Sequence, residues 1–180
     1  MIPTNVLQSI KKRISLHHQL YEVKVSAALW EETLHRSFLD ANLSSHWNKS
    51  GHQSGADVVA NNVRFACKSG EVMGKRDPKL SISSHRTTSY KTLEDKLKFL
   101  SENHEDVIAS LVNTNEQEYS VFLFERPKLL DLPWVETSAG WAATNEDGSS
   151  FTITRSMSDQ LWMKLNLKTW DSWGISRHDL

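Results

Sequence analysis

The stretch Asp57–Gly70 reads DVVANNVRFACKSG, and the fold that we expect is built outward from it. It opens with a short β-prone segment and continues into Asn61–Asn62, a turn signal because asparagine tolerates positive φ. Val63–Lys68 then alternates between an apolar face and a second face that carries Ala66 and Lys68. The stretch therefore predicts a β-hairpin with one apolar and one chemically distinct face.

This hairpin would bring a carboxylate and an amine together. Asp57 opens the first strand, and Lys68 lies on the second strand, where Ser-Gly follows it. Metal-dependent hydrolysis of a phosphodiester needs such a cluster, because carboxylates hold Mg²⁺ and the metal activates water and neutralises phosphate charge. A nearby lysine orients or deprotonates that water and stabilises the transition state. We therefore take Asp57 as a metal ligand and Lys68 as a catalytic residue.

The pattern resembles that of the PD-(D/E)-x-K nuclease superfamily, and of type II restriction endonucleases in particular. The family pattern is an acid, a turn and then acid-x-Lys on the next strand. Asp57 matches the first acid and Lys68 the lysine, whereas Ala56 replaces the proline and Ala66 stands where the second acid would be. The resemblance covers Ala27 to about Val121.

Ala66 leaves three explanations open. It is an inactivating substitution, of the kind that traps a nuclease on uncut DNA; or the acid has migrated, with Glu71 or a helix glutamate replacing it; or the chain is a natural non-cleaving relative. A purely structural hairpin, whose acid and lysine are ordinary surface residues, is the further alternative. As written, Ala66 predicts impaired or absent cleavage with binding largely retained.

The resemblance implies an α/β (α+β) fold, with a mixed central β-sheet flanked by helices in a restriction-endonuclease-like core. It also implies a site-specific endonuclease that hydrolyses double-stranded DNA with Mg²⁺, for which Mn²⁺ is a possible substitute. A short palindromic site would imply a homodimer with twofold symmetry. The alternative is a non-catalytic DNA-binding or interaction module on the same fold.

A glutamate on the preceding helix is a further candidate ligand. Residues 6–42 read as helical because apolar side chains recur every three or four positions. Nucleases of this superfamily often carry a glutamate on that helix, facing the metal. Glu31 points more inward than Glu32, since it shares a line with Leu34 and Phe38. An inward glutamate needs a partner, and a metal-bound water would serve; two solvent-facing acids are the alternative.

A basic segment follows the lysine. Between Arg64 and Lys91 there are seven cations and two acids, which gives seven minus two, or +5, in a chain of net charge −1. Cations and short hydroxyls suit phosphate contacts, and His or Arg can reach base edges. We therefore expect DNA contacts here and after the last hairpin, although a solvated flexible loop is the alternative. The candidate DNA-binding residues are Lys75, Arg76, Ser84, His85, Arg86, Thr87, Arg155 and Gln160.

The rest of the chain completes the expected organisation. We expect a loop over 70–89, a helix over 91–103, strands over 106–112 and 119–124, a hairpin pairing 141–144 with 150–154, and a short helix over 158–167. Together these elements form a single nuclease-like domain over 1–180. Its parts are an N-terminal helical part (1–45), a catalytic core (56–125) and a C-terminal hairpin and helix (134–180).

Composition narrows the class of protein. A near-neutral charge argues against a uniformly basic nucleic-acid coat protein and against a highly charged disordered tail. The single cysteine, Cys67, excludes an internal disulfide framework and a cysteine-rich zinc site, and its alternation places it in the core. The sequence carries no secretory signal pattern and no apolar run of the roughly 18 residues that span a bilayer. We therefore expect a cytoplasmic protein with no membrane partner.

Overall fold

The computed structural model describes residues 2–48, 56–102 and 105–180. Its architecture is mixed α+β, as the sequence predicts, and the chain forms two compact units. The first unit comprises Met1–Ser69, His104–Glu125 and Ile175–Leu180, and the second comprises Gly70–Asn103 and Arg126–Gly174. The boundary falls within one long strand, inside the 56–125 segment.

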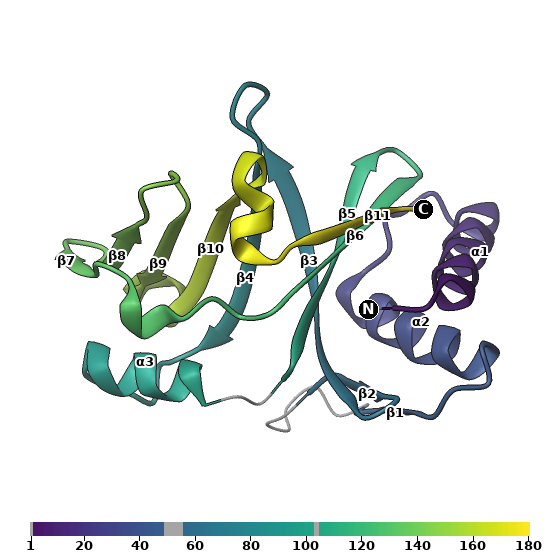
Figure 1. The fold of residues 1–180 in the computed structure, drawn as a ribbon, viewed down its shortest axis with the longest axis horizontal. Helices are drawn as coiled ribbons and strands as arrows, with labels where there is room; N and C mark the ends of the chain where they lie inside the picture. Colours follow the sequence, from purple (N-terminus) through teal and green to yellow (C-terminus); the bar gives the residue numbers. More distant parts are fainter. Residues whose placement is uncertain (1, 49–55, 103–104) are drawn as a thin grey trace. The chain divides into compact units, whose positions relative to one another are not determined.

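The first unit combines two helices with one part of the strands (Figure 1). Its elements are α1 (Thr4–Leu20), α2 (Ala27–Asp40), β1 (Ser45–Trp47), β2 (Val58–Ala60), the first part of β3 (Val63–Met73), β5 (Val107–Asn115), β6 (Glu118–Phe124) and β11 (Ser176–Asp179). The strands follow the order β11-β6-β5-β3, with β2 pairing both β3 and β1. Asn61 and Asn62 form the turn between β2 and β3 with φ of 49° and 65°, which confirms the predicted hairpin.

The predicted helix over 6–42 is wrong in its continuity, because it divides into α1 and α2. The Ser26 side chain accepts a hydrogen bond from the Leu29 backbone and so begins α2. The predicted apolar line also has the wrong phase in α1. Leu16 and Leu20 are 46% and 74% exposed, and Val23, which follows the helix, is 67% exposed. The buried side chains of α1 lie on another face of the helix, four positions apart. These buried residues of α1 are Val6, Ile10 and Ile14.

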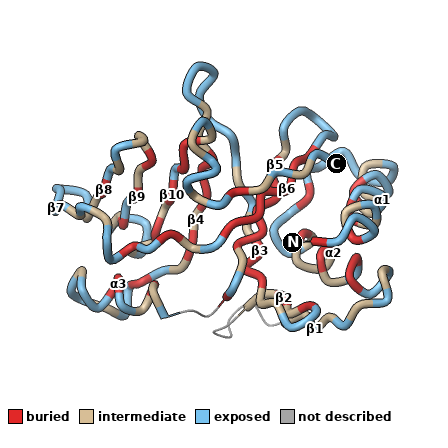
Figure 2. Tube along the Cα trace, viewed as in Figure 1, coloured by how far each residue is buried: buried red, intermediate tan, exposed pale blue. Residues whose placement is uncertain are grey.

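The core of the first unit lies between the two helices and the strands. Trp30, Leu34 and Phe38 of α2 are buried, as their spacing predicts, and the Phe38 ring lies 5.6 Å from that of Phe65 on β3. Cys67 is buried in the same core. The buried part of β3 is Phe65–Cys67, and Figure 2 shows buried residues in α1, α2 and this strand. The apolar face of the hairpin thus anchors β3, and with it the position of Lys68.

The second unit is a run of antiparallel strands with one α-helix. Its elements are the last residues of β3, β4 (Lys79–Arg86), α3 (Leu93–Ser101), β7 (Val135–Thr137), β8 (Gly140–Thr144), β9 (Ser150–Thr154), β10 (Gln160–Asn166) and the 3-10 helices η1 (Leu129–Asp131), η2 (Arg155–Met157) and η3 (Leu167–Trp173). The strands follow the order β3-β4-β10-β9-β8-β7. The predicted helix near 91–103 and the predicted hairpin of β8 with β9 are confirmed.

Two predictions in the second unit are wrong. The segment 70–89 is a strand hairpin rather than a loop, because Leu80 and Ile82 alternate with serines and are buried between β3 and β10. The segment 158–167 is strand β10 rather than a helix. Leu161 and Leu165 fit a helical spacing, but Met163 is buried between them, so the period is two.

In the part of the chain that the structure describes, no helix has the length and apolar character needed to cross a membrane.

Candidate active site around Asp57 and Lys68

The β2–β3 hairpin brings Asp57 and Lys68 together, as the sequence predicts. The Asp57 backbone N–H donates to the Phe65 carbonyl at 3.0 Å, which fixes the residue beside β3. Its Oδ2 atom accepts a hydrogen bond from the Cys67 backbone N–H at 2.7 Å. Lys68 Nζ lies 3.4 Å from the same oxygen, and the two side chains are 23% (Lys68) and 28% (Asp57) exposed. The acid and the amine therefore form an ion pair that water reaches.

The second oxygen of Asp57 is uncommitted. Both contacts of the carboxylate use Oδ2, and Oδ1 accepts no hydrogen bond from the described residues. A carboxylate oxygen has lone pairs for two donors or for a cation. Oδ1 therefore has capacity for a ligand.

Strand β1 adds a residue that the sequence did not assign. Trp47 pairs with Val58 of β2, and the next residue, Asn48, donates its backbone N–H to the Asp57 carbonyl at 3.0 Å. The Trp47 indole N–H donates to Glu31 Oε2 at 3.2 Å. The sequence leaves Trp47 open as a core or contact residue, because its partner lies 16 positions away on α2. The structure makes it a hydrogen-bond donor to the candidate glutamate.

The charges of the site act on Glu31. Burial raises the pKa of the Glu31 carboxyl above its ordinary value, the Trp47 hydrogen bond lowers this pKa, the Asp57 charge raises it and the Lys68 charge lowers it. Burial prevails, so the ionised form of Glu31 is less stable than in water. Glu31 thus belongs to the same electrostatic cluster as the acid–lysine pair, as expected from its inward line on the helix.

Ala66 supplies no polar atom to the cluster. It lies on β3 next to Phe65, the strand partner of Val58, and is 3% exposed. Its neighbour Cys67 is buried, and burial raises the pKa of the thiol well above its ordinary value, with the charges of Asp57 and Glu31 acting in the same direction. A thiol in this state does not ionise near neutral pH, so Cys67 is a core residue rather than a nucleophile.

Two carboxylates are what this cluster offers to a cation. Among the residues described, no group of three or more His, Cys, Asp and Glu side chains is placed to hold a metal ion. Mg²⁺ nevertheless binds through one or two carboxylates, with waters and substrate phosphate completing its shell. Asp57 with its uncommitted Oδ1, and Glu31 with one hydrogen bond, fit that mode of binding.

Three of the predicted DNA-contact residues lie on the β3–β4 hairpin with exposed side chains. Lys75 and Arg76 are in the turn, and Arg86 ends β4. In the described part of the chain none of the three forms an ion pair with an acid. Their charges are therefore available to an anionic partner.

The predicted DNA contacts of Ser84 and Thr87 are wrong, because both side chains are buried. Ser84 is 6% exposed, and its carbonyl accepts a hydrogen bond from the Gln160 side chain at 3.0 Å. Thr87 has no exposed surface, and its hydroxyl donates to the Asp159 carbonyl at 2.7 Å. Ser84 is thus bonded to the first residue of β10, and Thr87 to the residue before it.

The other three predicted contacts take part in internal interactions. His85 is half-buried and lies 3.1 Å from an Arg126 guanidinium nitrogen. Gln160 is half-buried, and its side-chain amide donates a hydrogen bond to the Ser84 carbonyl of β4. Arg155 is exposed, pairs with Glu136 and lies 4.7 Å from the centre of the Trp141 ring. Arg155 therefore keeps an accessible surface, whereas the other two are held mainly by the fold.

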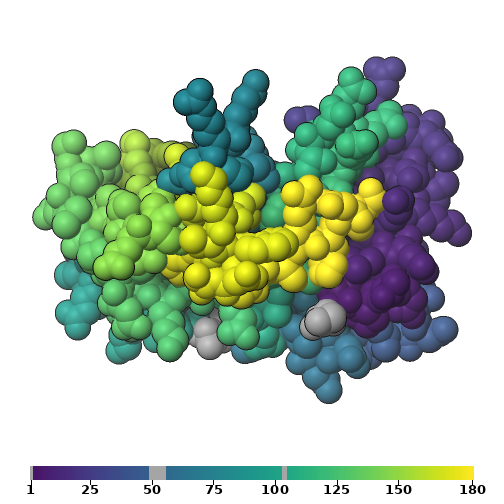
Figure 3. All heavy atoms as spheres, turned by 45° about the horizontal axis from the view of Figure 1, so that its top comes forward, coloured from purple at the N-terminus to yellow at the C-terminus, as the bar shows by residue number. Residues whose placement is uncertain are grey.

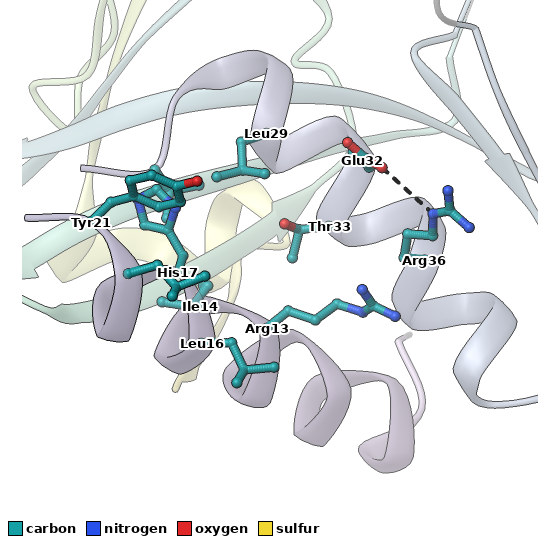
Figure 4. A pocket seen from close by; sticks show the side chains of 11 residues that line it. Arg13, Ile14, Leu16, His17, Tyr21, Leu29, Glu32, Thr33 and Arg36 are labelled. Atoms are coloured by element: carbon teal, nitrogen blue, oxygen red, sulfur yellow. Dashed lines mark ion pairs between the residues drawn. The ribbon is translucent and has the colours of Figure 1, made fainter. Parts of the chain in front are cut away.

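A separate cavity of about 280 Å³ lies between α1 and α2 (Figure 4). Ile14, Leu16 and Leu29 form its apolar wall, and the Glu32–Arg36 ion pair lies at its edge. None of its lining residues belongs to the cluster around Asp57 and Lys68. The cavity is therefore no extension of the candidate active site.

Comparison of the chain with protein-family models, with curated proteins and with solved structures found no match.

Proposed function

We propose that this chain is a sequence-specific endonuclease of duplex DNA, similar to type II restriction enzymes of the PD-(D/E)-x-K superfamily, and that Ala66 impairs its cleavage. The observation that carries the proposal is the contact of Lys68 Nζ with Asp57 Oδ2 at 3.4 Å on adjacent strands of one hairpin. A glutamate on the preceding helix shares the electrostatic environment of this pair. These features support a restriction-endonuclease-like core.

Each residue of the cluster has a distinct role in the proposed reaction. Lys68 holds a positive charge where the phosphodiester would lie, and its ammonium can orient the attacking water or stabilise the developing charge. The Cys67 backbone N–H and Lys68 both fix the Asp57 carboxylate through Oδ2. In the proposed reaction, Oδ1 is the oxygen left to bind the cation. Trp47 holds the Glu31 carboxylate in place.

Asp57 and Glu31 are the residues that would hold Mg²⁺, or Mn²⁺ in its place. A bound cation would neutralise the phosphate charge, which Lys68, the amine of this cluster, neutralises only in part. Its binding would also favour the ionised form of Glu31, which burial disfavours. Binding to a short palindromic site would require a homodimer with twofold symmetry.

A second candidate function is favoured by Ala66 itself. A buried methyl group replaces the ligand that the second acid would supply at this position. A protein of this kind would bind duplex DNA without cutting it. The two functions share the DNA-binding surface and differ in whether a carboxylate at position 66 restores chemistry.

The test is to restore that carboxylate. We expect Ala66→Glu, and the shorter Ala66→Asp in case the larger side chain does not fit, to cleave supercoiled plasmid DNA with Mg²⁺ or Mn²⁺. Ala66→Gln is the matched control, since it has the volume of glutamate without its charge. Lys68→Ala in the Ala66→Glu background should abolish the gained cleavage.

The outcomes separate the two functions. Cleavage by either acidic variant, with none by Ala66→Gln, supports the endonuclease. Folded acidic variants that bind duplex DNA but cut none with either metal would favour the non-cleaving protein. Folded variants that neither bind nor cut duplex DNA would contradict both proposals.

A further inference from the structure

The turn of the β3–β4 hairpin extends beyond the strands beside it. Among the described residues, β4 pairs with β10 only as far as Lys79, and the base of the turn at 74–78 contacts η3, because the Pro78 carbonyl accepts a hydrogen bond from the Leu167 backbone N–H at 2.9 Å. Figure 1 shows this loop projecting past the end of β10, and Figure 3 shows side chains of this teal segment standing clear of the surface. The hairpin therefore presents a two-stranded tip to a partner.

The turn of this tip requires a glycine and includes two ion pairs. Gly74 has φ of +83°, and a Cβ atom at this position would lie 2.6 Å from the Asp77 carbonyl oxygen. Asp77 is held by Lys79 at 3.9 Å and by Lys168 at 3.5 Å. Because these ion pairs offset the one acid of the turn, the charges of Lys75 and Arg76 are left for an external anion.

The tip also exposes apolar surface beside its cations. Val72 and Met73 are 41% and 42% exposed, immediately before the turn. Phosphate contacts alone need cations and hydrogen-bond donors, and they give no use for exposed aliphatic side chains. Contacts with base edges can use aliphatic side chains, because the major groove displays the thymine methyl group beside the guanine acceptors O6 and N7.

We propose that the tip of the β3–β4 hairpin enters the major groove of duplex DNA and reads bases there. Arg76 would bind a guanine edge, Lys75 would bind a phosphate, and either Val72 or Met73, which lie on opposite faces of β3, would contact a thymine methyl group. A two-stranded ribbon with strands about 4.8 Å apart fits a groove about 12 Å wide, whereas the minor groove is about 6 Å wide. This inference rests on the proposed function for its partner and extends it to the mode of recognition.

The experiment first selects duplexes from a random 20-bp library with the full-length protein. Each thymine of a selected duplex is then replaced in turn by deoxyuridine, which lacks the methyl group, and affinity is measured by fluorescence anisotropy. We expect at least one replacement to weaken binding about fourfold, the effect of one buried methyl group. Met73→Gln or Val72→Ser should lose that sensitivity.

Two further variants sharpen the measurement. Met157→Gln is the matched control, because Met157 is an equally exposed methionine (45%) of the same unit but lies outside the hairpin, and it should keep the deoxyuridine sensitivity. Arg76→Ala should weaken binding by at least about fivefold and should no longer discriminate guanine from 7-deazaguanine, which lacks the N7 acceptor.

Each outcome has one meaning. Folded hairpin variants that bind selected DNA as tightly as the unaltered chain, with no deoxyuridine effect, would overturn the inference and leave the proposed function standing. Weakened hairpin variants whose DNA shows no deoxyuridine effect, and which a minor-groove ligand displaces, would overturn the assignment of the groove. Failure to enrich any duplex would overturn both proposals.

Discussion

Asp57 in the first unit and Asp147 in the second are both half-buried aspartates next to a hairpin strand, but their carboxylates are used differently. Both Asp147 oxygens accept hydrogen bonds, from the Ser149 backbone at 2.8 Å, Thr169 at 2.7 Å and the Trp173 indole at 2.6 Å, among others. Asp57 accepts its two contacts through Oδ2 alone.

The difference distinguishes a structural carboxylate from an available one. Asp147 ties the β8–β9 turn to the segment η3, and every one of its donors would lose a partner without it. Asp57 is held firmly enough to be oriented but keeps one oxygen free among the described residues. An aspartate with this pattern can add a ligand without breaking the fold, and we expect mutation to cost more stability at Asp147 than at Asp57.

The largest expected effect on stability is that of Asp147→Ala. It leaves the Ser149, Thr169 and Trp173 donors unsatisfied, so we expect the free energy of unfolding to fall by about 3 kcal/mol in urea titrations. Asp171→Asn is the control, since Asp171 is an exposed aspartate of η3, and its effect should stay within about 0.5 kcal/mol.

The pH dependence of this stability has a defined sign. Burial raises the pKa of Asp147, but the hydrogen bonds from Ser149, Thr169 and Trp173 outweigh it and bring the pKa below the ordinary 3.8. The stability that Asp147 contributes is therefore present above pH 3.8 and is lost as the pH falls through its folded-state pKa. Equal losses from Asp147→Ala at pH 7 and at a pH below both values would contradict this account.

Local signals explain what the sequence predicted well. The Asn61–Asn62 turn and the alternation that follows it fix the β2–β3 register, and that register alone brings Asp57 to Lys68. The same is true of the apolar spacing in α2, which predicted the burial of Trp30, Leu34 and Phe38. These features depend on residues close in the chain, so a single sequence carries them.

The missed features depend on distant partners. Strand β4 looked like a loop because its two buried aliphatic residues, Leu80 and Ile82, stand among serines and cations, and β10, its partner, comes some 80 positions later. The Trp47–Glu31 hydrogen bond joins an edge strand to a helix, and no spacing indicates it. The burial of Thr87, which removed it from the DNA contacts, likewise depends on Asp159.

A smaller effect on stability is expected at Asp57, with a large one on metal binding. Asp57→Asn keeps an oxygen for the Cys67 N–H but loses the ion pair with Lys68, which solvent partly screens, so the cost should be about 1 kcal/mol or less. We expect Mn²⁺ binding, followed by calorimetry in the Ala66→Glu background, to fall at least tenfold. Unchanged Mn²⁺ affinity would show that the free oxygen is not a ligand.

The smallest effect should have the opposite sign. Burial raises the pKa of Glu31, so its ionised form lowers stability: the protein is most stable below pH 4.5 with respect to this group and loses that stability as the pH rises through the folded-state pKa. Glu31→Gln should therefore stabilise the protein at pH 7, by less than about 1 kcal/mol because water screens the half-buried carboxylate, and should have no such effect at pH 4.

The neighbouring Glu32→Gln is the matched control for this last prediction. Glu32 forms a half-exposed ion pair with Arg36 at 3.6 Å on the same helix, so its removal should cost up to about 0.5 kcal/mol rather than stabilise. If Glu31→Gln stabilises the protein, the ionised Glu31 carboxylate is not there for stability. If Glu31→Gln instead destabilises the protein at pH 7, Glu31 belongs with Asp147 as a structural carboxylate, and the metal-ligand assignment loses its second residue.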